Sequence, residues 1–286
     1  MLDMTKGLVL RSLLMFSIPA LIGNVLNQVY SLTDSIIVGR ILGMEALAAV
    51  GCTMPIVLLA ASLMIGVNMA VSILLSQAYG KGDMALLRRT FANSLYVGLA
   101  AAIIMAVGGN LLAEPVLRLL GTPEGPFPDA LAYIRVNFTT AFCPLFYFIL
   151  SCAYRGMGDS RTDLYCLMVS VGANIFLDYL FVAELGWGVA GSAWATAAAQ
   201  LMSAVFATIL LFVKYPEIRF QKGELRPNPA MLRNVTKMAA PIALQCAFGN
   251  LGNIVAQGAV NAFVALMNGA MKGVSSAFNA VREPLR

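Results

Sequence analysis

The stretch SVGANIFLDYLFV, residues Ser170 to Val182, decides the class of fold. It is an apolar run interrupted by one carboxylate, Asp178, and by one amide, Asn174, four positions earlier. A run of this kind is typical of a membrane-spanning helix, which needs about 20 mostly apolar residues. Residues four apart share one face of a helix. Because an ionisable side chain in hydrocarbon is costly, Asp178 is expected to have a functional role.

The composition of the 286-residue chain also indicates a membrane protein. Hydrophobic residues make up 59% of the chain and charged residues 12%, whereas a soluble domain carries roughly 25% charged residues. The net charge of +5 comes from Lys and Arg in short clusters between apolar runs. Nucleic-acid binding would instead favour a basic stripe with aromatic side chains, so no nucleic-acid partner is expected.

Catalysis and metal chemistry are not expected from this composition. The chain has no histidine, the commonest general base and metal ligand. Its five cysteines lie in apolar runs without CxxC spacing, which favours buried side chains over a zinc site or disulfides. No nucleophile clusters with a base, so we expect neither an enzyme nor a cofactor.

Seven apolar segments predict an all-α, polytopic membrane protein. They cover residues 12–38, 46–79, 90–113, 131–154, 164–183, 188–213 and 238–265. The second segment is too long to stand upright in a bilayer, and Pro55 and Gly66 could bend it. The Pro- and Gly-rich residues 114–130 are predicted to form an aqueous loop. The predicted units are a six-helix amino-terminal lobe (1–213), a cytoplasmic loop (214–237), and the first helix of a second lobe with a divergent tail (238–286).

The distribution of basic residues predicts the orientation. The loops after the second, fourth and sixth segments carry most of the Lys and Arg, and the positive-inside rule places them in the cytoplasm together with the N-terminus. The first segment is longer than the apolar region of a signal peptide and contains Pro19, so it is predicted to be a span. We therefore expect a multi-pass protein of the cell (plasma) membrane, with the lipid bilayer as its surroundings.

The seventh segment repeats a pattern of the first. Aligning Pro241 on Pro19 places Asn250 on Gln28 and Asn253 on Ser31. Such a repeat after six spans is typical of a duplicated transporter lobe. Two full lobes would need a longer chain than this one, so we expect most of the second lobe to be absent. Whether two chains associate to replace that lobe stays open.

Three polar positions are predicted to lie at one depth in the membrane. Asp34 lies six residues before Arg40, at the outer end of the first segment. Asp178 lies six residues before Glu184, at the outer end of the fifth. At 1.5 Å per residue each is about 9 Å below the outer surface, and Thr196 of the sixth segment is about 10 Å deep. Matching depth on three helices predicts that these groups converge.

The first segment also carries a polar stripe. Its members recur every three or four residues and share a helix face that must meet other helices or a water-filled cavity. They are Asn24, Asn27, Gln28, Ser31, Asp34 and Ser35. The residues predicted to line a substrate cavity are Asn24, Asn27, Gln28, Ser31, Asn250 and Asn253. In an alternative that stays open, the aspartates cap helix ends or sit at the membrane interface without a function.

Two cations suit the buried acids. A carboxyl group in a poorly hydrated cavity can carry a proton near neutral pH. Two carboxylates with an amide and a hydroxyl could instead bind sodium, a hard cation that takes oxygen ligands. Either cation would change the energy of moving the helices. The residues predicted to form this cation-coupling site, and to be the metal ligands if the ion is sodium, are Asp34, Asn174, Asp178 and Thr196.

Several stretches resemble the multidrug and toxic compound extrusion (MATE) family. They are SIPALIGNVLNQVYSLTDSIIVGRILGMEALAAVG, YRGMGDSRTD and NIFLDYLFVAELGWGVAGSAWATAAAQ, within a resemblance that covers about residues 10–262. The resemblance implies a two-lobe, twelve-helix exporter in which proton or sodium entry drives out amphiphilic, often cationic compounds. It also implies an amino-lobe cation site at Asp34, Asn174, Asp178 and Thr196. From about Val264 the sequence departs from the family, and the five further helices of the family are expected to be missing.

Two other functions are disfavoured. A flippase for lipid-linked saccharides, of related architecture, would need basic residues inside its cavity for a pyrophosphate group, and we find none well inside a predicted span. A purely structural subunit would not need two acids at matched depth. The transported compound and the choice between proton and sodium stay open.

Overall fold

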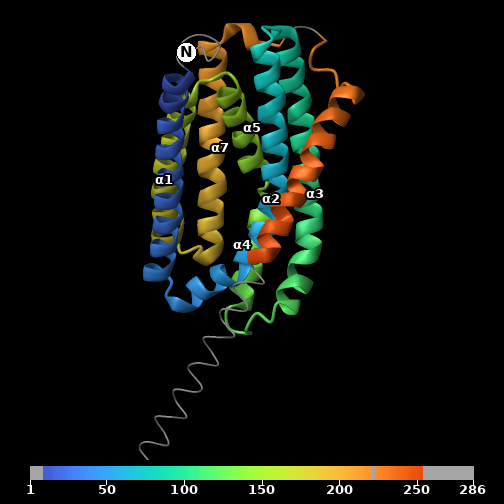
Figure 1. Ribbon diagram of the computed structural model, residues 1–286. Helices are drawn as coiled ribbons and strands as arrows, with labels where there is room; N and C mark the ends of the chain where they lie inside the picture. The colour runs from blue at the N-terminus through green and yellow to red at the C-terminus, as the bar shows by residue number, and fades with distance from the viewer. Residues whose placement is uncertain (1–8, 221–222, 254–286) are drawn as a thin grey trace, which may run out of the picture.

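Helices form nearly all of the chain that the structure describes, because backbone polar groups in a bilayer must bond within their own segment. The computed structural model describes residues 9–220 and 223–253, and no strand occurs among them (Figure 1). The helices are α1 (Val9–Ile41), α2 (Met44–Gly80), α3 (Met84–Leu119), α4 (Phe127–Thr139), α5 (Phe142–Gly156), α6 (Ser160–Asp178) and α7 (Gly188–Lys214). A π-helical turn, η1 (Tyr179–Glu184), extends α6, a 3-10 turn, η2 (Pro216–Ile218), follows α7, and residues 229–253 are helical.

Several of these helices can cross a membrane. Four described helices are long and apolar enough: α2, α3, α6 continued through η1, and α7. Helices α4 and α5 are bent by 47° relative to each other and together would form a fifth span. The predicted segment 131–154 is therefore one broken helix. Helix α1, which contains the predicted segment 12–38, is 33 residues long and packs mainly against α6.

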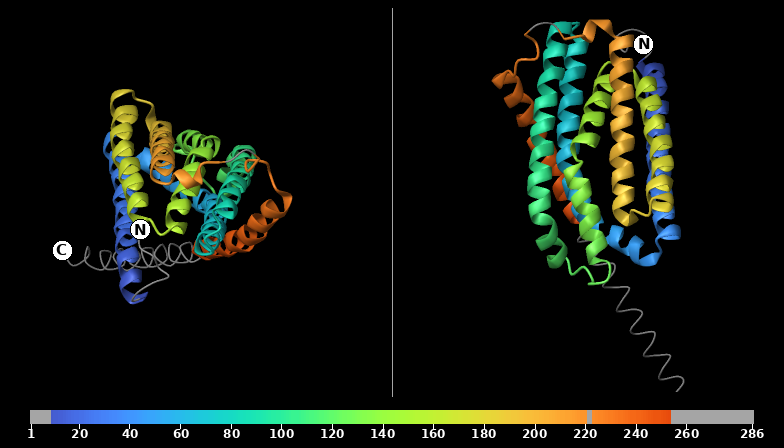
Figure 2. Two further views of the ribbon diagram at one scale, coloured as in Figure 1. Left: turned by 90° about the horizontal axis from the view of Figure 1, so that it is seen from above. Right: turned by 180° about the vertical axis from the view of Figure 1, so that it is seen from behind.

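The other helices of the bundle are arranged around α5. Seen from above, α1 and α6 lie on one side of the bundle, and α2, α3 and residues 229–253 lie on the other (Figure 2). Helix α5 lies between them and contacts α2, α3, α6 and α7. Its buried side chains include Tyr147, Leu150 and Tyr154, which belong to the main hydrophobic core. This arrangement leaves α1, α6 and α7 as neighbours, which positions the predicted polar residues.

The prediction of an aqueous loop over residues 114–130 was wrong for most of its length. Helix α3 continues through Pro115 to Leu119, and α4 begins at Phe127. The last turns of α3 are held by Leu117, which is completely buried, and by a pair between Arg118 and Glu114 at 2.9 Å. Burial of a helix face outweighed the local preference of proline and glycine for a loop.

The helix of residues 229–253 packs closely against α2. A Cβ atom added to Gly66 would lie 2.5 Å from Ala243 Cβ and 2.7 Å from the Ala239 carbonyl oxygen, so only glycine allows this approach. Asn250 donates from its amide to the Leu58 carbonyl oxygen at 2.9 Å. The helix begins nine residues before the predicted start at 238, and residues 254–265 of that prediction lie outside the described residues. Gly66 therefore allows close packing of two helices. The first part of α2 runs across one end of the bundle before the helix turns along it (Figure 1).

Helix α3 contacts α4 and α5 through two more glycines. Small residues allow membrane helices to approach closely. A Cβ on Gly98 would lie 2.4 Å from side-chain carbons of Leu145 and Ile149, and one on Gly109 would lie 2.4 Å from the Phe138 ring. The neighbouring Gly108 has nothing within 4 Å of its added Cβ. Of these two adjacent glycines, Gly109 faces a packed contact and Gly108 faces open space.

We predict that Gly109→Val destabilises the protein while Gly108→Val does not. Overfilling a packed contact costs about 1–3 kcal/mol, and the two variants share the same change in helix propensity. The midpoint of thermal unfolding in detergent measures the difference. Equal midpoints for the two variants would contradict the packing of Gly109 against Phe138.

Candidate functional site

The turn after Asp178 has an unusual winding. Residues 179–184 form η1, in which the Leu185 N–H donates to the Leu180 carbonyl oxygen at 2.9 Å across five residues. Phe181 stacks on Trp187 with ring centroids 4.7 Å apart. Wide π turns within helices occur frequently at functional sites. Here the turn places Asp178 at the last α-helical position of α6.

The glycines of the motif GVAGSAWAT allow α7 to turn back against α6. Gly188 has a φ of 63°, which favours glycine. A Cβ on Gly191 would lie 3.3 Å from the Phe181 carbonyl oxygen, so this close contact also favours glycine. Ser192 and Thr196 follow one turn apart on α7 and face α1 and α6.

The polar groups of α1, α6 and α7 meet at Thr196. Asn174 is fully buried and donates from its amide to the Thr196 hydroxyl at 3.4 Å. The Tyr30 hydroxyl of α1 lies 3.0 Å from the same Thr196 oxygen. One threonine therefore links two neighbouring helices through hydrogen bonds.

The two aspartates lie beside this link. The Ser192 hydroxyl donates to Asp34 Oδ1 at 2.5 Å. The carboxyl groups of Asp34 and Asp178 are near enough to interact with each other and with the hydroxyl groups of Tyr30 and Tyr133. Asp178 is fully buried, whereas Asp34 is partly exposed. Two carboxyl groups from separate helices thus share one polar cluster.

Three buried oxygens in this cluster have no hydrogen-bond partner within the described part of the chain. They are both carboxylate oxygens of Asp178 and the amide oxygen of Asn174. A buried acceptor without a partner costs about 1–3 kcal/mol, so a fold that keeps three together requires an explanation. Carboxylate, amide and hydroxyl oxygens are the ligands of hard cations, and a proton shared by two carboxyl groups would also reduce the cost. Residues 9–220 and 223–253 hold no group of three or more His, Cys, Asp or Glu arranged for a metal ion.

Only some residues of the predicted polar stripe of α1 line a cavity between the described helices. Asn24 and Asn27 line a cavity, whereas Gln28 and Ser31 are exposed and do not line it. At 100° per residue the stripe is about 120° wide, and of its members Asn24 and Asn27 line the cavity and Asp34 contacts α7. The sequence pattern could not show which edge faced inward.

The two predicted residues of the seventh segment lie elsewhere. Asn250 donates to the Leu58 carbonyl oxygen and to the Ser62 hydroxyl of α2, both at 2.9 Å. Asn253 is exposed. Neither lines the cavity, because their helix packs on the opposite side of the bundle from α6 (Figure 2).

Sequence reasoning missed three hydroxyl groups of the cluster. Tyr30 lies one turn before Asp34, Ser192 lies one turn before Thr196, and Tyr133 comes from α4. The four-residue spacing could have identified Tyr30 and Ser192, because residues four apart share a helix face. Tyr133 had no such signal, since it is brought to the site by the packing of α4 alone.

A cavity lies between α1, α5, α6 and α7. Its volume is about 200 Å³. Its polar lining includes Asn24, Asn27, Tyr30, Ser170 and Gln200 toward the acids and Ser151, Arg155, Ser160 and Asp163 toward the other end of α6. Tyr30 lines the cavity and its hydroxyl contacts Thr196, so this one side chain lies between the cavity and the cluster.

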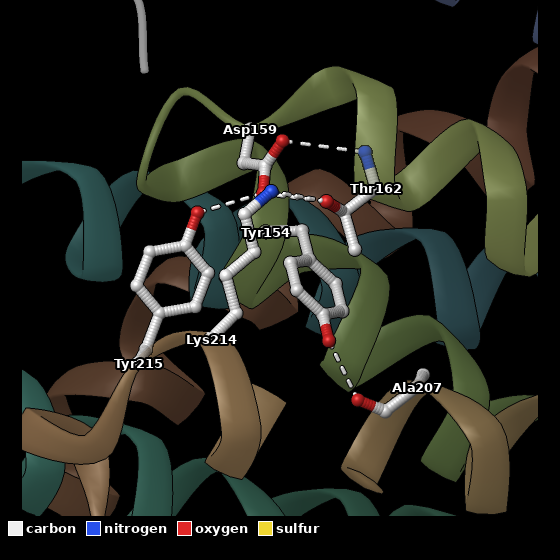
Figure 3. Close-up of polar contacts among 6 residues, drawn as sticks. All are labelled: Tyr154, Asp159, Thr162, Ala207, Lys214 and Tyr215. Atoms are coloured by element: carbon white, nitrogen blue, oxygen red, sulfur yellow. Dashed lines mark hydrogen bonds and ion pairs between the residues drawn. The ribbon is translucent and has the colours of Figure 1, made fainter. Parts of the chain in front are cut away.

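The motif YRGMGDSRTD forms a hydrogen-bond network that fixes α6 to α7 (Figure 3). Asp159 caps α6 by accepting from the Thr162 N–H at 3.2 Å. Its other oxygen accepts from Lys214 Nζ at 2.6 Å and from the Tyr215 hydroxyl at 2.7 Å. Burial alone would raise the pKa of Asp159, but the bonds from Lys214, Thr162 and Tyr215 outweigh burial and lower its pKa below the ordinary value.

The same motif contributes a second link. The Tyr154 hydroxyl, which is completely buried, donates to the Ala207 carbonyl oxygen of α7 at 2.6 Å. Gly158 has a φ of 77°, which allows the tight turn between α5 and α6. These contacts lie at the end of the bundle opposite to Asp178 and hold the relative positions of α5, α6 and α7.

Apolar helices of spanning length around a buried polar cluster define a multi-pass membrane transport protein. The MatE family model matches residues 19–180. The chain is 31% identical over 281 residues to "Probable multidrug resistance protein YpnP" of Bacillus subtilis (strain 168), covering 98% of this chain and 61% of the relative. The chain therefore belongs to the MATE family of transporters, and the predicted all-α, polytopic membrane fold is confirmed.

Other proteins are similar over a comparable region. "Multidrug export protein MepA" of Staphylococcus aureus (strain MRSA252) is 25% identical over 242 residues, which cover 84% of this chain and 53% of that protein. A solved structure of a multidrug resistance MATE family transporter in an outward-facing conformation has a TM-score of 0.77 at 26% identity, covering 86% of this chain and 54% of that chain. A MOP superfamily transporter from Pyrococcus furiosus has a TM-score of 0.78 at 26% identity over similar shares. The chain thus spans between half and two thirds of the length of these relatives.

We predict that Asp159→Asn destabilises the protein at neutral pH. The variant keeps a capping oxygen but removes the charge that Lys214 contacts, and hydrogen bonds to charged groups contribute about 1.5–3 kcal/mol, less where a partner is exposed as Lys214 is. Because the pKa of Asp159 is lowered by folding, its contribution is complete above the ordinary pKa of about 3.9 and is lost as pH falls through the lowered value.

The unfolding midpoints of wild type and variant, measured between pH 7 and pH 3, test this prediction. The difference is expected to be constant down to about pH 5 and to shrink below about pH 4. Glu114→Gln is a matched control, because Glu114 pairs with Arg118 on an exposed helix surface and is worth at most about 0.5 kcal/mol. A difference that grew as pH fell would contradict the assignment.

Proposed function

We propose that this chain forms the amino-terminal lobe, with the start of the second lobe, of a cation-coupled exporter of amphiphilic, often cationic compounds. The coupling ion is a proton or sodium. The printed names of the relatives describe multidrug resistance and export, which supports this class of substrate. The observation that carries the proposal is the cluster of Asp34, Asn174, Asp178 and Thr196, in which buried oxygens lack partners in the described chain.

The residues of the cluster have distinct roles in this proposal. Asp178 and Asp34 supply negative charge, Asn174 and Thr196 supply neutral oxygens, and Ser192 orients the Asp34 carboxylate through its hydrogen bond. A cation bound between the acids would offset the cost of their burial. Because the acids stand on α1 and α6, binding favours the arrangement of helices in which they are close.

Coupling requires that the two states of the transporter differ in this arrangement. A ligand shifts an equilibrium only by its differential affinity for the two states. Separation of α1 from α6 and α7 would break the Tyr30–Thr196 and Ser192–Asp34 contacts, and the cation site would be lost with them. Substrate binding that favours the separated state therefore releases the cation, which is the basis of antiport.

The proposed orientation places the N-terminus in the cytoplasm of a cell whose plasma membrane holds the protein. Basic residues at the ends of three helices, Arg155 of α5, Arg161 of α6 and Lys214 of α7, lie at one end of the bundle, and Asp178 lies toward the other. Under the positive-inside rule the acid pair is then nearer the external face. A flippase is not favoured, because the arginine of the cavity, Arg155, is paired with Asp163 at 3.2 Å and is not free for a pyrophosphate group.

We predict that Asp178→Asn and Asp34→Asn each reduce cation binding at least about tenfold. Removal of one charge at about 4 Å from the ion removes roughly 4 kcal/mol of attraction in a partly hydrated site. Sodium titration and proton release of the purified protein in nanodiscs measure binding and distinguish the two ions. Drug efflux from a host that lacks its own exporters measures coupling, and both variants are expected to insert but to export nothing.

Asp129→Asn is the matched control, because Asp129 is an exposed carboxylate on α4. It is expected to bind the cation and to behave as wild type in efflux. Wild-type cation binding in both Asp34→Asn and Asp178→Asn would refute the assignment of the coupling site.

A further inference from the structure

Mostly polar residues continue along three facing helices from the acid pair toward the opposite end of the bundle. The spacing in each row is three or four residues, so each row follows one helix face. The rows are Asp163, Ser170, Asn174 and Asp178 on α6, with the apolar Leu167 between the first two; Ser192, Thr196, Gln200 and Ser203 on α7; and Gly23, Asn27, Tyr30 and Asp34 on α1. Asp163 and Asp178 are fifteen residues apart, which is about 22 Å along the helix. The rows therefore cross most of the thickness of a bilayer.

The cavity between α1, α5, α6 and α7 lies along the part of these rows that is far from the acid pair. Its volume of about 200 Å³ is below the roughly 300–1,000 Å³ of sites for drug-sized ligands. Several water molecules fit such a space, since each takes about 30 Å³ of liquid volume. The size and polar lining suit a hydrated ion better than an amphiphilic compound.

An ion pair lies at the end of the cavity that is far from the acid pair. Arg155 Nε lies 3.2 Å from Asp163 Oδ2, and Arg155 Nη2 donates to the Ser151 hydroxyl at 2.7 Å. Ser151 in turn donates to Asp163. The Arg155 side chain is 43% exposed and that of Asp163 is 18% exposed. The pair is neutral as a unit, so it does not repel a cation as an unpaired arginine would.

At its end nearest the acid cluster, the cavity is bounded by Tyr30 and Gln200. Gln200 has a buried amide oxygen without a hydrogen-bond partner in the described chain, and it lines the cavity. Tyr30 lines the cavity as well, and its hydroxyl contacts Thr196, which accepts from Asn174. Oxygen atoms are thus available at each step from the cavity to the aspartates.

We propose that this cavity is the route by which the coupling cation passes between the acid pair and the cytoplasm, within the amino lobe. Ser151, Arg155 and Asp163 form its mouth, and Tyr30 and Gln200 form its inner end. The route rests on the proposed function, since it serves the ion that the acid pair binds. It separates the path of the ion from the path of a larger substrate, which the cavity does not admit.

Silver ion tests the route, because it is a small monovalent cation that reacts with thiols. In a background where the five native cysteines are alanine, Ser170→Cys places a thiol in the cavity. Gly172→Cys is the matched control on the same helix at the same depth, because Gly172 is exposed with nothing within 4 Å of its added Cβ. Silver nitrate is added to inside-out or right-side-out vesicles, and unreacted thiols are then counted with a maleimide dye after denaturation.

Silver on the cytoplasmic face is expected to modify Ser170→Cys at least about ten times faster than Gly172→Cys, because entry of a cation into hydrocarbon costs several kcal/mol. Modification from the cytoplasmic face is expected to be faster than from the external face. Equal rates for the two variants, or faster modification from the external face, would overturn the route while leaving the acid pair as a cation site. Loss of cation binding is tested separately with Asp178→Asn. If that variant binds as wild type, the proposed function fails and the route fails with it.

A double variant tests the mouth. Arg155→Gln with Asp163→Asn removes both charges and leaves no unpaired charge, and it is expected to raise the silver rate at Ser170→Cys about threefold by loosening the mouth. Retention of the same thermal unfolding midpoint as the single-cysteine parent shows that the fold is kept. An unchanged or lower rate in a folded double variant would overturn the role of this pair.

Discussion

The cost of placing polar groups away from water is the constraint on which the site depends. Backbone groups meet it by forming helices, whereas Asn174 of α6 and Asp34 of α1 meet it through hydrogen bonds to Thr196 and Ser192 of α7. An acceptor that keeps no partner is destabilising, and Asp178 keeps two such oxygens within the described chain. In the proposed coupling mechanism, a cation that joins the acids offsets this cost and strengthens the contact between these helices.

The rest of the bundle positions this cluster. The Asp159 network fixes α6 against α7 at one end, and the turn from η1 to Gly188 fixes them at the other. Glycines at positions 98 and 109 bring α3 against α5 and α4, which places Tyr133 of α4 near the acids. Contacts far from the site along the sequence thus determine the distances within it.

Much of the fold could be predicted from the sequence because apolar length is a direct signal of a membrane helix. Apolar length predicts the segments around Asp34, Asp178 and Thr196, and the helix rise predicts that these residues lie at similar depths. Other features depend on tertiary contacts. The break between α4 and α5 and the continuation of α3 through Pro115 follow from burial of particular side chains. Tyr133 reaches the acids only through helix packing, and the inward edge of the α1 stripe is selected by contact with α6.

The winding of the π turn that follows Asp178 determines the direction in which this carboxylate points. A π turn holds one residue more than the α-helix allows for the same number of turns. If residues 179–184 rewound as α-helix, Asp178 would rotate by about 100° relative to Leu185, and the bond from the Leu185 N–H to the Leu180 carbonyl oxygen would be exchanged for α-helical bonds. A change between π and α winding would therefore turn the Asp178 carboxylate toward or away from its neighbours on α1.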